Sequence, residues 1–256
     1  MDVSDYIGFV ASEGELFASA AEHGELSVAI APCPGWEMRE LVRHLGMIHL
    51  WAAANVAFPE SDWLDVHDLP DLVRYWPELA AGYPEDADPV DWYRDTLANL
   101  IQVLKSAPAD LECFSFLPAP SPLAMWARRQ ASEIAIHRFD AEQSRDITSH
   151  FDPQFATDML DELMCGFAVR PRSLDIERPE VIHVHANDTD EHWYVSVGPE
   201  QTETTRQGAH ADLTLTGTAS DLYLLLWNRT PDTSIAMSGN TDLMDLWHAN
   251  FRVRWG

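Results

Sequence analysis

Lysine is almost absent from this chain of 256 residues: Lys105 is the only one, and the other fifteen of its 16 basic residues are arginines. Acidic residues outnumber basic ones by 42 to 16, which gives a formal net charge of −26. A surface this negative repels phosphate backbones and anionic lipids. We therefore expect neither nucleic acids nor membrane surfaces among the partners of this protein.

Cysteines and long apolar runs are also scarce. The three cysteines (Cys33, Cys113 and Cys165) are far apart and odd in number, so they form neither a CxxC pair nor a disulfide framework. No window approaches the roughly 18 apolar residues of a membrane span. The opening segment, Met1 to Ala20, alternates acidic with apolar residues and does not resemble a leader. These absences predict a soluble cytoplasmic protein.

The first 150 residues are patterned as helices. Apolar residues recur near the 3.6-residue period of an amphipathic helix, and proline-rich stretches interrupt the pattern. The long connection Pro59–Pro89 is rich in Asp, Pro and Trp and is expected to be irregular, with a short helix near Leu69–Trp76. Four helices with one long crossover predict a four-helix bundle. They are expected at Asp2–Ala21, Trp36–Phe58, Val90–Ser106 and Ser121–Ser144.

The pattern changes after about residue 150, where short alternating runs typical of strands replace the long helical periods. We predict two domains, 1–150 and 151–256, of which the second is a small α+β domain with an antiparallel sheet. Its strands are expected at Val181–His185, Trp193–Val197, Thr202–Arg206, Ala211–Thr216 and Ser234–Ser238, and its helices at 153–169, Ala219–Asn228 and Thr241–Asn250.

Three residues of the predicted bundle have side chains that ligate metals. Glu133 and His137 are four residues apart on one helix, so their Cβ atoms lie about 5–6 Å apart on one face. His49 lies on the apolar stripe of the second helix and is expected to point into the bundle. Two histidines and one carboxylate leave an open position on a zinc-like ion, as in catalytic sites. The spacing also fits a solvated carboxylate and a core histidine with a hydrogen-bond partner, and alone it leaves these readings open.

Other histidines are less informative. His44 lies five residues before His49, about 140° around an ideal helix, so we expect it to point away from the ion and to donate to a backbone carbonyl. His183 and His185 alternate on one strand face, with His192 nearby. This group can bind a metal, but we favour the interpretation that it lies on an exposed strand face.

Several runs of the sequence resemble the mycothiol-dependent maleylpyruvate isomerase family. The first is CPGWEMRELVRHLGMIH, from Cys33 to His49; the second is WARRQASE, from Trp126 to Glu133, followed by IHRFDAE, from Ile136 to Glu142. A softer resemblance covers Asp212–Gly217 and Ala219–Arg229 near the end of the chain.

The resemblance implies a fold and a ligand set. Members of the family have an N-terminal DinB-like four-helix bundle and a smaller C-terminal domain similar to sterol carrier proteins. They carry a divalent metal, usually zinc, on a His of the second helix and a Glu-x-x-x-His pair of the fourth. In this sequence those positions are His49, Glu133 and His137, and mycothiol is the implied thiol cosubstrate.

The resemblance therefore implies a metal-dependent, mycothiol-utilising isomerase or S-transferase acting on small electrophiles, with a metal-bound thiolate as nucleophile. Mycothiol in turn implies an actinobacterial cytoplasm. Arg129 and Asp140 are candidates for binding the cofactor or substrate, and Arg229 is a candidate catalytic residue from the second domain. For each of these three residues a structural salt bridge is the alternative.

Two other functions stay open. One is a metal-dependent hydrolase or lyase that uses metal-bound water, for which activity without added thiol would be the sign. The other is a non-catalytic metal-binding or regulatory module. The sequence does not identify the electrophile, the metal, the thiol or the oligomeric state.

Overall fold

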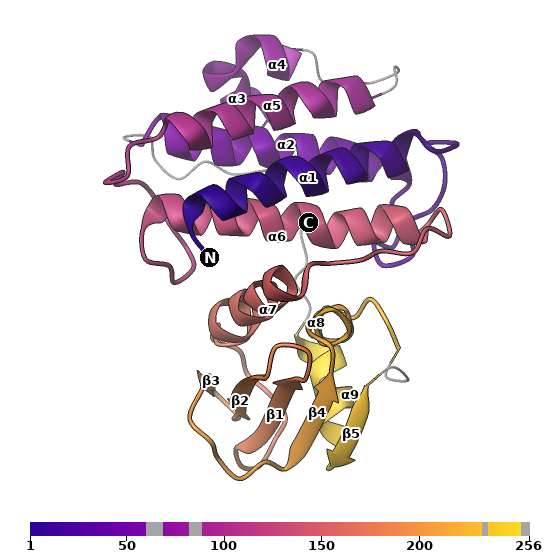
Figure 1. The fold of residues 1–256 in the computed structure, drawn as a ribbon, viewed down its shortest axis with the longest axis vertical. Coiled ribbons are helices and arrows are strands. Elements are labelled where there is room, and N and C mark those ends of the chain that lie inside the picture. The colour runs from indigo at the N-terminus through magenta and orange to yellow at the C-terminus, as the bar shows by residue number, and fades with distance from the viewer. Residues whose placement is uncertain (60–68, 82–88, 232–234, 252–256) are drawn as a thin grey trace. The chain divides into compact units, whose positions relative to one another are not determined.

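The computed structural model describes residues 1–59, 69–81, 89–231 and 235–251. The chain divides into two compact units, Met1–Ser149 and His150–Gly256 (Figure 1). Within the described residues, no helix has the length and apolar character that a membrane crossing needs. The predicted α+β class, with a helical N-terminal part and a mixed C-terminal part, is confirmed.

The first unit is built from four long helices. Helix α1 packs against α5 and α6, and α2 packs against the same two helices, so the four surround one apolar core (Figure 1). Two short helices, α3 (Leu69–Tyr75) and α4 (Pro77–Ala81), lie on the crossover between α2 and α5; α4 was not predicted. Residues 60–68 and 82–88 of the crossover lie outside the described residues. The long helices are α1 (Val3–Glu22), α2 (Met38–Ala57), α5 (Val90–Ser106) and α6 (Pro122–Gln143).

Helix α6 is the centre of this unit, because nearly every one of its side chains is buried. Ser121 caps its N-terminus by accepting a hydrogen bond from the backbone N–H of Ala124 at 3.2 Å. Pro122 follows at the first helical position, where its missing N–H costs nothing. The helix has polar residues among its buried positions, and these must be paired inside the bundle.

The second unit begins with α7 (Pro153–Glu162) and a π-helical turn η1 (Leu163–Phe167), where a single helix was predicted. Within the described residues its strands form a sheet in the order β3-β2-β1-β4-β5. The prediction of an antiparallel sheet is wrong for one pair, because β1 and β4 run parallel. The remaining elements are β1 (Glu180–Ala186), β2 (Glu191–Val197), β3 (Thr202–Thr205), β4 (Leu213–Gly217), α8 (Ala219–Leu226), β5 (Ala236–Gly239) and α9 (Asp242–Asn250).

The two faces of this sheet differ in polarity. Ile182, Val184 and Trp193 point to the buried face, which helix α8 covers by packing on β1 and β4. The alternate residues of β1 and β2 are half-buried, and they include His183 and His185 on β1. Three of the unit's histidines, His183, His185 and His192, lie on this second face of the sheet.

Candidate metal centre

Four polar residues follow one stripe of α6 at spacings of four, four and three residues. Arg129, Glu133, His137 and Asp140 are each at most 4% exposed. The Arg129 guanidinium lies 2.6 Å from Oε2 of Glu133, and Nε2 of His137 lies 3.3 Å from Oε1 of the same carboxylate. Nδ1 of His137 lies 2.9 Å from Oδ2 of Asp140. Each side chain of the stripe is therefore paired with the next, which is how buried charges are tolerated.

The pairing determines the ionisation of the stripe. Burial by itself raises the pKa of Glu133, but the charge of Arg129 and hydrogen bonds from His137 and His44 outweigh it, so the pKa lies well below its ordinary value. Burial likewise works against the charged form of His137, but its contacts with Asp140 and Glu133 raise the pKa above the ordinary value. Glu133 is therefore an anion at neutral pH, with oxygens available to a cation.

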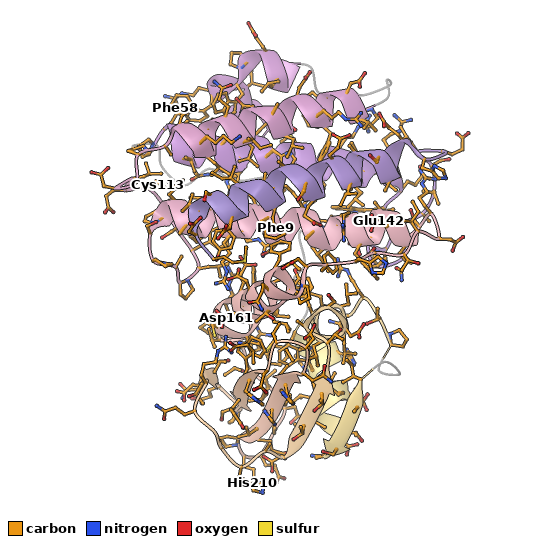
Figure 2. The ribbon with its side chains drawn as sticks, viewed as in Figure 1. Phe9, Phe58, Cys113, Glu142, Asp161 and His210 are labelled. Atoms are coloured by element: carbon orange, nitrogen blue, oxygen red, sulfur yellow. The ribbon has the colours of Figure 1, made fainter. Side chains whose placement is uncertain are left out.

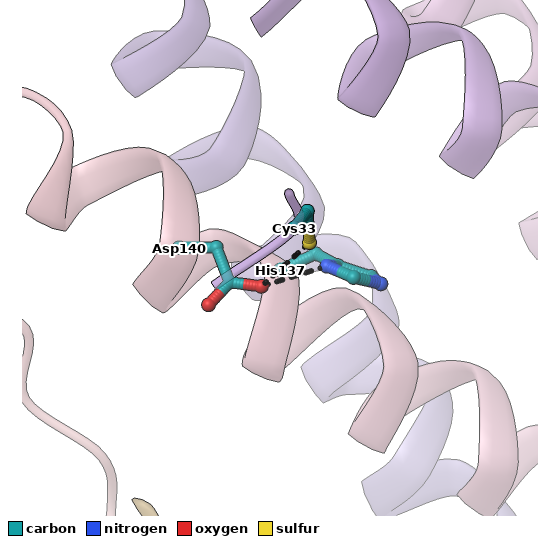
Figure 3. Close-up of side chains that lie close together, drawn as sticks. All are labelled: Cys33, His137 and Asp140. Carbon is teal, nitrogen blue, oxygen red and sulfur yellow. Dashed lines mark hydrogen bonds and ion pairs between the residues drawn. The ribbon is translucent and has the colours of Figure 1, made fainter. Parts of the chain in front are cut away.

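His137 has a different neighbour on each ring nitrogen. Figure 3 shows the Nδ1 side, where Asp140 accepts from the ring and Cys33 lies next to the carboxylate, with Sγ 4.0 Å from Oδ2. The Nε2 side faces Glu133. A carboxylate on one ring nitrogen fixes the tautomer and leaves the other nitrogen as a ligand, an arrangement common in metal sites.

His44 of α2 also reaches the carboxylate. Its Nε2 lies 3.3 Å from Oε1 of Glu133, and its ring packs against the ring of His137 at 5.3 Å. The ligand atoms of His44, Glu133 and His137 all lie within 4.8 Å of one another. The expectation that His44 points away from the site is wrong. It was based only on the angle between His44 and His49 on α2, whereas Glu133 extends from the facing helix α6 and contacts His44.

His49 is fully buried, and its two ring nitrogens have unequal surroundings. Nδ1 lies 3.2 Å from Oγ1 of Thr96, and that hydroxyl donates its proton to the carbonyl of Tyr93 at 2.8 Å. Because the hydroxyl proton is used, Nδ1 of His49 must be the donor in their contact. The lone pair is then on Nε2, which is buried and has no hydrogen-bond partner among the described residues.

The same surroundings keep His49 neutral. Burial lowers the pKa of His49 to about 3, with a further contribution from His44, while the charge of Glu133 opposes the shift. A neutral imidazole with an unsatisfied buried lone pair is the form that ligates a metal. His49 is not within the group of ligand atoms that His44 forms with Glu133 and His137, so its place in the ligand set stays a prediction.

Thr96 was not predicted as a residue of the site, although its position in the sequence carries a signal. It lies on the apolar face of α5 between the buried residues Tyr93 and Leu97, where a hydroxyl needs a partner. Arg129, predicted to bind the cofactor or substrate, pairs with Glu133, and its predicted role stays a prediction. Arg229 lies after α8 in the second unit, where its Nη1 donates to the carbonyl of Trp227 at 3.0 Å. Its predicted catalytic role stays a prediction.

The donor set fits a divalent transition metal. Imidazole nitrogens and a carboxylate are the ligands that zinc and similar ions bind in proteins. The orphaned Nε2 of His49 is the strongest sign, because a buried lone pair without a donor costs free energy unless an ion or another group satisfies it.

These features define a class of protein: a helical unit with a buried His-Glu-His donor set, followed by a small α+β unit. Residues 10–142 match the family model of the mycothiol maleylpyruvate isomerase N-terminal domain. Residues 154–246 match the model of the MDMPI C-terminal domain. The chain therefore belongs to the mycothiol maleylpyruvate isomerase family, and the resemblance found in its motifs is confirmed.

Solved structures show the same fold. A crystal structure of the mycothiol-dependent maleylpyruvate isomerase is similar with a TM-score of 0.60 at 10% identity, covering 93% of each chain. A histidine-to-alanine mutant of the mycothiol-dependent maleylpyruvate isomerase is similar with a TM-score of 0.64 at 9% identity, again covering 93% of each chain. The search of curated proteins finds no match.

Proposed function

We propose that this protein is a metal-dependent enzyme that uses mycothiol as its thiol cosubstrate, as an isomerase or S-transferase acting on small electrophiles. The observation that carries the proposal is the contact between Glu133 and His137, together with the unsatisfied Nε2 of His49 that is buried in the same bundle. We propose Glu133, His137 and His49 as the ligands and zinc as the metal.

When bound, such an ion supplies Lewis acidity, because a thiol that coordinates it loses its proton and becomes nucleophilic near neutral pH. The residues of the chain prepare the ligands for the ion. Arg129 keeps Glu133 ionised through their 2.6 Å contact. Asp140 and Thr96 accept from Nδ1 of His137 and of His49, so that Nε2 is the nitrogen each ring would offer to an ion; at His137 the ion would replace the proton that Nε2 donates to Glu133.

His44 competes with His49 for the third ligand position. Distance favours His44, whose Nε2 lies 3.3 Å from the carboxylate. The hydrogen bonding favours His49, because Nε2 of His44 already contacts the Glu133 carboxylate, whereas Nε2 of His49 has no partner within the described residues. We therefore assign His49 as ligand and His44 as a hydrogen-bond donor that orients Glu133.

The first test is metal content. Tag-free wild type, Glu133→Gln, His49→Asn and His44→Asn are saturated with zinc, passed through a desalting column and analysed by mass spectrometry. His23→Asn is the matched control, because His23 is an exposed histidine of the same unit. We expect Glu133→Gln and His49→Asn to lose one equivalent relative to the wild type, and His44→Asn and His23→Asn to keep it.

The second test is activity. The zinc-loaded wild type is assayed with mycothiol and maleylpyruvate, and then with mycothiol and other small electrophiles. Turnover that requires both the thiol and the ion supports the proposal. Turnover of a substrate without thiol would favour the hydrolase or lyase instead. Loss of the equivalent in His44→Asn but not in His49→Asn would overturn the ligand set, and no loss in Glu133→Gln would overturn the site.

A further inference from the structure

The polar face of the C-terminal sheet carries a second cluster of ligating side chains. His185 on β1 and His192 on β2 are directly opposite each other in the strand register. Asp190, in the turn that joins the two strands, lies beside both. We propose that His185, Asp190 and His192 form a second metal site, independent of the bundle, that binds a divalent transition-metal ion with zinc as the ion expected.

The distances fit an ion. Oδ1 of Asp190 lies 3.4 Å from Nε2 of His185 and 3.5 Å from Nε2 of His192. Two ligand atoms of a tetrahedral zinc site are roughly 3.3–3.5 Å apart, given bonds of about 2.0–2.2 Å. All three ligand atoms lie within 4.8 Å of one another. Two edges of the coordination polyhedron therefore already have the spacing that zinc needs.

Hydrogen bonding explains the cluster less well. The contacts of Asp190 are longer than the 2.7–3.2 Å typical of N–H···O hydrogen bonds. Nε2 of His185 is buried, yet it makes no hydrogen bond within the described residues. The rings of His185 and His192 stack at 4.2 Å, an arrangement that two charged imidazoles would oppose. An ion between the nitrogens and the carboxylate would account for the first two features, and it would need neutral rings, which the stacking also favours.

Two hydrogen bonds hold the turn that carries Asp190 against the junction between β4 and α8. The backbone N–H of Asn187 donates to the carbonyl of Gly217 at 2.9 Å. The carboxylate of Asp188 accepts from the backbone N–H of Ala219 at 2.9 Å. Asp190 itself has a left-handed backbone, with φ of 55°. These contacts fix the position from which the third ligand is presented, which lowers the entropy lost on binding.

His183 orients one of the proposed ligands. Its Nε2 lies 2.9 Å from Nδ1 of His192, and its ring stacks on Tyr194 at 4.4 Å. When Nδ1 of His192 donates the proton of that contact, Nε2 of His192 has the lone pair that a metal needs. His183 is therefore a positioning residue for this site, in the role that a carbonyl or carboxylate has in other metal sites.

The ligand types select the ion. With 42 acidic residues, the chain attracts any cation, including Mg²⁺ and Ca²⁺, to its carboxylates. Imidazole nitrogens favour zinc, copper and nickel, whereas Mg²⁺ and Ca²⁺ prefer oxygen. Zinc that stays bound in excess Mg²⁺ is therefore held by the histidines and not by the acidic surface.

The test is a calorimetric titration of the full chain with zinc in excess Mg²⁺, comparing wild type with His185→Gln and His192→Gln. The matched control is His210→Gln, because His210 is an exposed histidine of the same unit, in the loop between β3 and β4 (Figure 2). We expect both cluster variants to bind one equivalent less than the wild type and His210→Gln to be unchanged. His183→Phe keeps an aromatic ring and should weaken this equivalent by about 10–100-fold.

A second measurement does not depend on how the variants fold. In ¹⁵N-detected histidine spectra of the wild type, zinc should shift the Nε2 signals of His185 and His192 and leave that of His210 in place. Equal stoichiometry in wild type and folded cluster variants would overturn the proposal, as would unchanged Nε2 signals of the two histidines. The Glu133→Gln variant should keep this equivalent, which separates the site from the one in the bundle.

Discussion

Thr96 provides the sharpest test of the bundle site, because it acts on the metal only through His49. Its hydroxyl accepts from Nδ1 of His49 at 3.2 Å and donates to the carbonyl of Tyr93 at 2.8 Å. Thr96→Val removes the hydroxyl and keeps the branched shape. The buried ring must then either leave Nδ1–H unsatisfied or move its proton to Nε2, which removes the ligand lone pair.

The magnitude follows from burial. An unsatisfied N–H in a fully buried site costs about 1–3 kcal/mol of stability. Loss of a partner that orients a ligand histidine weakens metal binding by about 10–100-fold. We expect Thr96→Val to lose both this stability and this metal affinity. Thr96→Ser keeps the hydroxyl and should recover most of the affinity.

The assay is zinc competition against a chromophoric chelator in a His192→Gln background, so that only the site in the bundle is titrated. Urea unfolding of the metal-free protein gives the stability, and ¹⁵N spectra of the His49 ring give the tautomer. Zinc affinity of Thr96→Val within about threefold of the parent would refute the reasoning. So would equal losses in Thr96→Val and Thr96→Ser, because a merely steric effect would not distinguish the hydroxyl.

Three further predictions concern buried groups of the bundle. Glu133→Gln should lower the unfolding free energy of the metal-free protein by about 3–5 kcal/mol, because Arg129 loses a carboxylate at 2.6 Å; the double variant with Arg129→Met should recover part of this in urea unfolding. Burial raises the pKa of Glu13 from 4.5 to about 7, so the folded state holds this proton more tightly than the unfolded state. The resulting stability is complete below pH 4.5 and is lost as the pH rises through about 7, by about 3 kcal/mol in the wild type, whereas Glu13→Gln should lack this loss. Gly46→Ala places a Cβ in steric conflict with the ring of Trp92 and should cost about 1–3 kcal/mol despite the better helix propensity of alanine. Thermal unfolding at or above the wild-type temperature would contradict this prediction.

The helices of the first unit could be predicted well because their signals are local. Val90–Ser106 was predicted with the bounds that α5 has, since its apolar stripe begins after a proline and ends before a proline-rich stretch. Helix α4 was missed, because a helix of five residues is too short to show a period. The π-helical turn η1 was missed for a related reason: its residues have the same apolar pattern as an α-helix.

The pairing of strands could not be predicted from the same signals. Alternation identifies the residues of β1 and β4 that face the core, but it carries no information on the neighbour or direction of a strand. The parallel pairing of β1 with β4 follows from the crossover that the intervening chain makes. The position of His44 was predicted wrongly, because the angle between two residues on one helix does not show which side chains of another helix contact them.

Residue type and spacing identify ligands, but the position of a single proton decides whether a histidine can be one. At His49 that proton is placed by Thr96, 47 residues away, and at His192 we propose that it is placed by His183, nine residues away. Neither relation can be recognised from a sequence motif, because each depends on which helices or strands pack together.

The two clusters share ligand types but differ in solvation: His49 is fully buried, whereas the Asp190 side chain is 90% exposed. An ion bound in the bundle would therefore exchange most of its water ligands for protein ligands, while an ion bound on the sheet would keep water as a ligand. The buried cluster is accordingly the one suited to activating a bound thiol, and the sheet cluster is suited to holding an ion that exchanges with the solvent.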